Sequence, residues 1–161
     1  MMETKKIARA VILVAMAVAL SPIFIPVGFI KLFPAQHMIN VIGAVMVGPW
    51  YALGVATAAA IIRNILGVGT PLAFPGGMIG AFLAGMAYRV FKSIYGAAVG
   101  EVIGTGLLGA LVSLWIVAPM IMKKTMAASV LMGAFASSSI LGAILGVLVL
   151  QILRKAGIWN P

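Results

Sequence analysis

The stretch LFPAQHMINVIGAVMVGPWYALGVATAAAII, residues 32–62, decides the fold of this chain. It contains no Lys, Arg, Asp or Glu, and as a single helix it would be about 46 Å long at roughly 1.5 Å per residue. Crossing a hydrocarbon layer of about 30 Å takes only about 20 apolar residues. Gly48-Pro49 divides the stretch, because proline lacks the N–H that a helix interior needs. The pattern therefore predicts two consecutive short membrane helices.

Similar uncharged stretches lie on both sides of this one. Together they predict six membrane-spanning helices, at residues 6–21, 36–48, 50–66, 78–92, 95–118 and 127–153. No linker or convincing repeat divides the chain, so residues 1–161 are expected to form a single membrane domain. The sequence thus indicates an all-α integral membrane protein, a six-transmembrane-helix bundle.

The composition supports a place in the lipid bilayer and excludes several classes of function. Hydrophobic residues make up 64% of the 161 residues and charged residues only 8%, whereas about a quarter of a soluble domain is charged. The chain has no Cys, a single His and two acidic residues. Thiol chemistry, clustered metal ligands and a Ser-His-Asp triad are excluded, so we expect no enzyme, metal or cofactor. The Lys and Arg residues end apolar runs, which is not typical of nucleic-acid binding.

The cations also predict the orientation, because cytoplasmic loops carry an excess of Lys and Arg. With the N-terminus in the cytoplasm, seven cations are cytoplasmic: Lys5, Lys6, Arg9, Arg89, Lys92, Arg154 and Lys155. Only Lys31, Arg63, Lys123 and Lys124 are then on or near the outer side. Both termini are therefore expected on the cytoplasmic side of the cell membrane. The start of the chain has the outline of a signal peptide, but a retained first helix fits the charge count better.

Small residues recur at four-residue spacing, which places them on one helix face and lets helix backbones approach closely. For Gly100/Gly104 and Gly142/Gly146 this spacing predicts packing inside the bundle. Ala15 and Ala19 on the first helix leave two interpretations open, internal packing or a surface for another protein.

Two apolar, proline-containing connections, residues 21–35 and 67–77, fall on the outer side. The second reads GVGTPLAFPGG and is predicted to be irregular throughout, because it holds four Gly and two Pro. Irregular backbone at membrane depth is tolerated only where it is buried in protein or lines a cavity. The two connections therefore predict a lid over an outward-facing pocket.

Polar side chains inside the spans are the candidate site residues, because such groups are costly in a bilayer. Gln36, His37 and Asn40 share one helix face, where they either hold a small heterocycle or lie among lipid headgroups. Arg63 either extends to the interface or points inward beneath the second connection. An inward Arg63 argues against a cationic substrate and suits a neutral or anionic one.

Glu101 is the only acid inside a span, and we expect it in the cytoplasmic half, far from the lid. It either pairs with Arg89 or Lys92, or contacts the substrate or carries a proton. Phe74 and Trp115 are candidates for stacking on a ligand ring. Thiamine itself is disfavoured as the ligand, because its cation would want a carboxylate or an aromatic cage near the lid.

Several of these segments together resemble the ThiW family: PAQHMINV at residues 34–41, Gly48-Pro49, Arg63-Asn64, GTPLAFPG at residues 69–76, Gly100-Glu101 and Gly104-Thr105. Members of this family are small substrate-binding (S) components of energy-coupling factor (ECF) transporters, linked to thiazole uptake for thiamine synthesis. The likeness covers nearly the whole chain.

The resemblance implies a six-helix S-component fold with a pocket for hydroxyethylthiazole, a neutral heterocycle, under the two outer connections. It implies partners as well, a transmembrane T component with two cytoplasmic ATPases, which meets small residues of the first helix, here Ala15 and Ala19. The pocket residues that it suggests are Gln36, His37, Asn40, Arg63, Asn64 and Phe74, with Glu101 a further candidate.

The leading hypothesis is thus the substrate-capture subunit of an ATP-driven importer. The chain has no Gly-x-x-x-x-Gly-Lys phosphate loop, so another subunit must hydrolyse the ATP. The alternative is a stand-alone proton-coupled transporter in which Glu101 carries the proton. A membrane enzyme is disfavoured, because no second acid or base accompanies His37 or Glu101.

Overall fold

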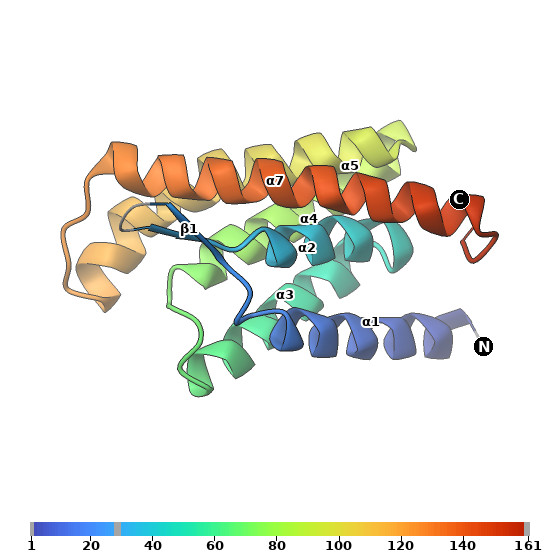
Figure 1. The fold of residues 1–161 in the computed structure, drawn as a ribbon, viewed down its shortest axis with the longest axis horizontal. Helices are drawn as coiled ribbons and strands as arrows, with labels where there is room; N and C mark the ends of the chain where they lie inside the picture. Colours follow the sequence, from blue (N-terminus) through green and yellow to red (C-terminus); the bar gives the residue numbers. More distant parts are fainter. Residues whose placement is uncertain (1, 28–29, 160–161) are drawn as a thin grey trace.

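The described chain runs back and forth along one axis, with both termini at the same end of the molecule (Figure 1). The computed structural model describes residues 2–27 and 30–159. Its elements are α1 (Met2–Ala19), β1 (Ile25–Val27), β2 (Ile30–Leu32), α2 (Pro34–Met46), α3 (Pro49–Ile65), α4 (Ala73–Phe91), α5 (Ile94–Glu101), η1 (Val102–Gly109), α6 (Ala110–Val112), η2 (Ser113–Ile121) and α7 (Ala128–Lys155). The α5–η2 elements follow one another without a break, so the described residues form six helical segments, the number predicted.

The first outer connection contains a short antiparallel hairpin, which the all-α prediction did not include. β1 pairs with β2, with Ile25 opposite Leu32. Branched residues such as Ile25 and Ile30 favour extended backbone, which explains the strands. The backbone N–H of Phe33 donates to Ser138 Oγ of α7 at 3.2 Å, so the hairpin is tied to the bundle where it ends. Residues 28 and 29 of this connection lie outside the described residues.

The predicted break at Gly48-Pro49 is confirmed, because α2 ends at Met46 and α3 begins at Pro49. Pro49 occupies the first position of α3, where its missing N–H would have no helical partner anyway. Gly48 has a φ of 88°, which favours glycine. The predicted helix at residues 95–118 is a longer segment, Ile94–Ile121, with π-helical hydrogen bonding in η1 and η2.

The second outer connection is shorter than predicted, because α4 already begins at Ala73. The prediction that residues 67–77 are irregular throughout, with a helix from residue 78, is therefore wrong. Pro75 lies in the first turn of α4, where a missing N–H costs little. A glycine is required at position 76 because α4 packs closely against α7. A Cβ atom built on Gly76 would lie only 2.7 Å from Phe135 Cε1 of α7.

Close backbone contact between α4 and the α5–η2 segment depends on four glycines, Gly76, Gly80, Gly104 and Gly109, which we call the glycine seam. A Cβ on Gly104 would lie 2.7 Å from Gly80 Cα, and one on Gly109 would lie 2.6 Å from Gly76 Cα. Gly146 packs α7 on α2 in the same way, with its Cβ position 2.9 Å from Val41 Cβ. The predicted internal packing at Gly104 and Gly146 is confirmed.

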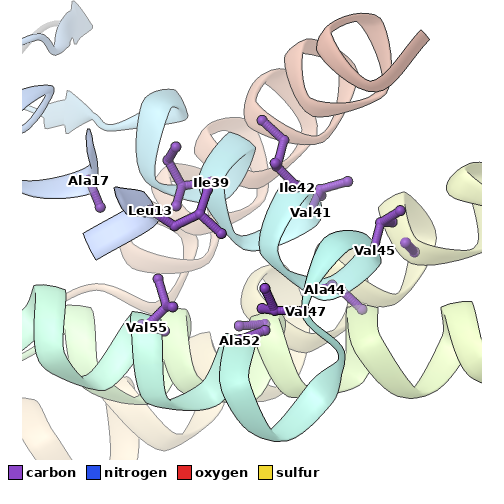
Figure 2. Close-up of a cluster of buried hydrophobic side chains, with 14 of the residues drawn as sticks. Leu13, Ala17, Ile39, Val41, Ile42, Ala44, Val45, Val47, Ala52 and Val55 are labelled. Atoms are coloured by element: carbon purple, nitrogen blue, oxygen red, sulfur yellow. The ribbon is translucent and has the colours of Figure 1, made fainter. Parts of the chain in front are cut away.

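A cluster of buried aliphatic side chains joins α1, α2 and α3 (Figure 2). Its labelled members are Leu13, Ala17, Ile39, Val41, Ile42, Ala44, Val45, Val47, Ala52 and Val55. Because α2 contributes five of these ten residues, more than any other element, this short helix is the centre of the cluster. That position fixes the first turn of α2, from which several candidate site residues project.

The outer surface of the helices is strongly apolar, with exposed side chains such as Ile144 and Leu148 on α7. Within the described residues, the segments Ile94–Ile121 and Ala128–Lys155 are long and apolar enough to cross a membrane by length and composition. α2, in contrast, has 13 residues and would reach only about 20 Å. The number of helical segments agrees with the prediction. That all six span a lipid bilayer stays a prediction.

Candidate ligand-binding site

A cavity of about 660 Å³ lies among the hairpin, the connection at residues 66–72 and the starts of α2, α4 and α7. In Figure 1 these elements meet at the end opposite the two termini. Small-molecule sites usually measure about 300–1,000 Å³, so the cavity has the size of a ligand pocket. It lies beside the connections at residues 21–35 and 67–77, which the sequence predicted to form a lid over a pocket.

Aromatic and aliphatic side chains make up much of the wall. Phe24 and Phe33 come from the hairpin region, with ring centroids 6.1 Å apart, and Leu131 and Phe135 come from α7. Lys31 also lines the cavity, with its Nζ 4.4 Å from the centroid of the Phe24 ring. The cavity therefore offers flat apolar surfaces of the kind on which a planar ring packs.

Arg63 is the most deeply buried charged group of the wall, with a side chain only 1% exposed. Its guanidinium carbon lies 5.2 Å from the centroid of the Phe33 ring, a cation–π distance. Neither Nε nor Nη1 has a hydrogen-bond partner among the described residues. Of the two interpretations of Arg63, the inward one is therefore confirmed.

The connection at residues 66–72 is folded around the end of α3. The N–H groups of Val68 and Gly69 both donate to the carbonyl oxygen of Arg63, each at 3.0 Å. Asn64 Nδ2 donates to the carbonyl oxygens of Ala60 at 2.8 Å and Thr70 at 3.2 Å. Asn64 thus holds this connection in place beside Arg63, and its amide nitrogen is already occupied.

A buried polar cluster lies behind the cavity wall and is centred on Glu101, which is 0% exposed. Glu101 Oε1 lies 2.8 Å from His37 Nδ1, 3.2 Å from Asn40 Nδ2 and 2.9 Å from Thr105 Oγ1. The other carboxylate oxygen, Oε2, has no hydrogen-bond partner among the described residues. His37 lines the cavity itself, so the carboxylate fixes the imidazole of a wall residue.

This cluster corrects two expectations about Glu101. Its partner is His37, and the suggested pairing with Arg89 or Lys92 is wrong, because both cations are exposed. Glu101 also lies next to the cavity instead of far from it. In the structure, the hydrogen bonds of Glu101 Oε1 to His37 and Asn40 hold the carboxylate directly behind His37, which lines the cavity.

The predicted site residues thus divide into three groups. Gln36, His37 and Arg63 line the cavity, while Asn40, Asn64 and Glu101 make the hydrogen bonds that support the wall. Phe74 is not part of the cavity lining in the described chain, because the helical start of α4 replaces the expected loop. Trp115 is 74% exposed, on the outer surface.

The sequence analysis missed other parts of the wall. Phe24, Phe33 and Phe135 supply the aromatic surface expected from Phe74. Thr105 is not among the predicted site residues, although its place four residues after Glu101 puts both on one helix face. For Phe135, which comes from α7, the sequence holds no comparable signal.

Ala15 and Ala19 are exposed and line a second hollow, a groove between α1 and α3. Gly54, Val55 and Ala58 of α3 lie along the same groove. The two alanines therefore do not serve packing inside the described bundle, and a contact with another protein stays a prediction.

Comparison with solved structures identifies the class of fold. The chain is similar to an S component of a bacterial ECF transporter, with a TM-score of 0.69, 14% sequence identity and 96% of each chain covered. This likeness confirms the S-component fold that the sequence suggested.

The family follows from a second comparison. Residues 7–156 match the model of the ThiW family, described as thiamine-precursor transporter protein. The chain therefore belongs to the ThiW family, and the expectation of a transport protein instead of an enzyme is confirmed. No curated protein matches the sequence.

Proposed function

We propose that this chain is the substrate-capture subunit of an ATP-driven importer and that it binds a thiazole precursor of thiamine, such as hydroxyethylthiazole. The observation that carries the proposal is the cavity, where Gln36, His37 and Arg63 face aromatic side chains. Membership in a family of thiamine-precursor transporters supports this substrate class.

The groups around the cavity suit a small ring with a polar substituent. Phe33 and Phe135 provide surfaces for the ring. His37 Nδ1 donates to Glu101 when the imidazole is neutral, which leaves Nε2 as an acceptor for a ligand hydroxyl. The Gln36 amide supplies both a donor and an acceptor at the cavity wall. Glu101 positions His37 by a hydrogen bond, and Asn40 donates to Glu101. Asn64 holds the connection at residues 66–72 through its hydrogen bond to Thr70.

The orientation and the partners belong to the same proposal. The elements that line the cavity meet at the end opposite the termini (Figure 1), so the cavity opens to the outside if both termini are cytoplasmic. The groove with Ala15 and Ala19 is then available to a transmembrane T component within the cell membrane. Two ATPase subunits complete the transporter, because this chain has no phosphate loop.

Binding and uptake experiments test the two halves of this proposal separately. The purified chain alone is expected to bind hydroxyethylthiazole, measured by titration calorimetry, and to prefer it over thiamine. Proteoliposomes are expected to accumulate the ligand only when the T component, the ATPases and ATP are present. A preference for thiamine would refute the substrate, and uptake without ATPases would refute the transport mode.

Proton-coupled transport by the chain alone is the second candidate, because Glu101 is a fully buried acid beside the cavity with one unpartnered oxygen. Proteoliposomes that hold only this chain, with an imposed proton gradient, decide between the two. We expect no gradient-driven uptake. Uptake that is lost in Glu101→Gln but kept in the control Glu3→Gln would favour the second candidate.

A further inference from the structure

We infer that the ligand of this cavity carries an oxyanion, so that the preferred substrate is a thiazole with a phosphate monoester or carboxylate group instead of the neutral alcohol. The inference rests on the proposed function, since it assumes that the cavity is the substrate site. It concerns the chemical class of the substrate, and it is carried by Arg63.

Arg63 is a buried charge without a counter-charge. Its side chain is 1% exposed, and Nε and Nη1 have no hydrogen-bond partner among the described residues. A buried guanidinium that lacks partners is expensive, so such groups are normally paired. The guanidinium carbon lies 5.2 Å from the centroid of the Phe33 ring, and this contact uses none of the N–H donors of Arg63. An oxyanion that reaches one of these N–H groups from the cavity would accept a charge-assisted hydrogen bond from it.

Neither acidic side chain of the protein pairs with Arg63. The chain contains only two acidic residues, Glu3 and Glu101. Glu3 lies at the start of α1 and accepts a hydrogen bond from the Tyr51 hydroxyl. Glu101 Oε1 is occupied by His37, Asn40 and Thr105 behind the wall. The side chains of this chain therefore supply no counter-charge for Arg63, and an anion that enters the cavity would do so.

The surroundings of Arg63 also favour an anion. Lys31 is a second cation on the cavity wall. The helices α2 and α4 begin at the cavity, and neither has an acidic residue in its first turn nor a side-chain cap. Helix N-termini carry a partial positive charge, which adds to the field of the two cations. A cationic ligand would meet repulsion here, and a neutral one would leave Arg63 without a counter-charge.

The volume leaves room for the additional group. At about 660 Å³ the cavity belongs to the size range that holds drug-sized ligands, which are larger than one five-membered ring with a short alcohol. A ring packed against the aromatic wall and an oxyanion at Arg63 would fill more of it. In the same arrangement, His37 and Gln36 would remain available for hydrogen bonds to the ring and its substituents.

The test compares four compounds on the purified full-length protein by titration calorimetry: hydroxyethylthiazole, its phosphate monoester, a thiazole carboxylate and inorganic phosphate. We expect at least one thiazole anion to bind about 10- to 100-fold more tightly than the alcohol, the range that corresponds to one or two charge-assisted hydrogen bonds. Inorganic phosphate is expected to compete only weakly, because it lacks the ring.

Variants assign the preference to Arg63. Arg63→Gln is expected to remove most of the preference for the anion, measured as the ratio of the dissociation constants of the alcohol and the anion, which should fall about 10-fold or more, as the loss of one charge-assisted hydrogen bond requires. Arg63→Lys keeps the charge without the planar fork and should retain part of the preference. Arg89→Gln, which removes an exposed cation from α4, is the matched control and should bind like the wild type.

Each remaining outcome decides the inference. If the wild type binds the alcohol as tightly as both anions, the inference is overturned while the proposed function stands, and this result does not depend on how the variants fold. An anion preference that survives in Arg63→Gln also overturns it. If nanodiscs with phosphatidylglycerol abolish a preference seen in zwitterionic lipid, the site belongs to a lipid headgroup. If no thiazole binds in any form, the proposed function itself fails.

Discussion

A single methyl group on α4 should disrupt the buried cluster around Glu101. Gly80 lies so close to this cluster that a Cβ atom would be 2.6 Å from Glu101 Oε2 and would overlap Thr105 Oγ1. Overpacking costs about 1–3 kcal/mol, and a displaced carboxylate loses a hydrogen bond worth about 1.5–3 kcal/mol. The gain in helix propensity from Gly to Ala is about 0.5–1 kcal/mol. The net expectation for Gly80→Ala is a destabilisation of about 3 kcal/mol.

Thermal unfolding of the purified protein measures this effect. For a chain of this length, about 3 kcal/mol corresponds to a decrease in Tm of about 6–12 °C. Gly133→Ala on α7 is the matched control, because no heavy atom lies within 4 Å of its Cβ position, and its Tm should stay equal or rise slightly. The affinity for the ligand should fall as well in Gly80→Ala, since His37 loses its fixed partner. Equal Tm values for the two variants would show that the cluster tolerates the methyl group, contrary to the packing described here.

Three further substitutions test other parts of the structure. Ala19→Leu fills the groove between α1 and α3, so ATP-driven uptake should fall about tenfold while calorimetry shows unchanged ligand binding; a parallel loss of binding would contradict a partner surface. Glu101→Gln places an amide nitrogen at the unpartnered Oε2 position, at a cost of about 1–3 kcal/mol, and an unaltered Tm would argue against the observed cluster. Asn64→Leu removes the hydrogen bonds to Ala60 and Thr70, so the dissociation constant should rise about fivefold with little change in Tm, whereas unchanged binding would show that the connection at residues 66–72 does not shape the cavity.

Local signals in the sequence predicted the helical scaffold well. The break at Gly48-Pro49 was predictable because proline and glycine act on the backbone of their own turn. The same residue types gave a wrong prediction at residues 73–77, where a loop was expected and α4 begins. Proline is also accepted in the first turn of a helix, so Pro75 does not exclude one. Whether Gly76 belongs to a loop or to a helix contact depends on Phe135, which is 59 positions later in the chain (135 − 76) and gives no local signal.

The candidate site was only partly predictable for a related reason. The polar residues could be recognised one by one, because each is costly in an apolar segment. The pairing of His37 with Glu101 joins residues 64 positions apart and depends on how far α2 reaches. The aromatic wall could not be predicted either, since phenylalanine is common in membrane helices and only the packing shows which rings face the cavity.

The glycine seam has a mechanical consequence. Where two helix backbones touch with no side chains between them, there are no rotamers whose rearrangement could let one helix slide along the other. α4 and the α5–η2 segment therefore move as one rigid body. The β1–β2 hairpin is attached differently, through contacts such as the hydrogen bond from Phe33 to Ser138. The close contact of the two backbones thus fixes the part of the cavity wall that Gly76 and Gly77 of α4 contribute.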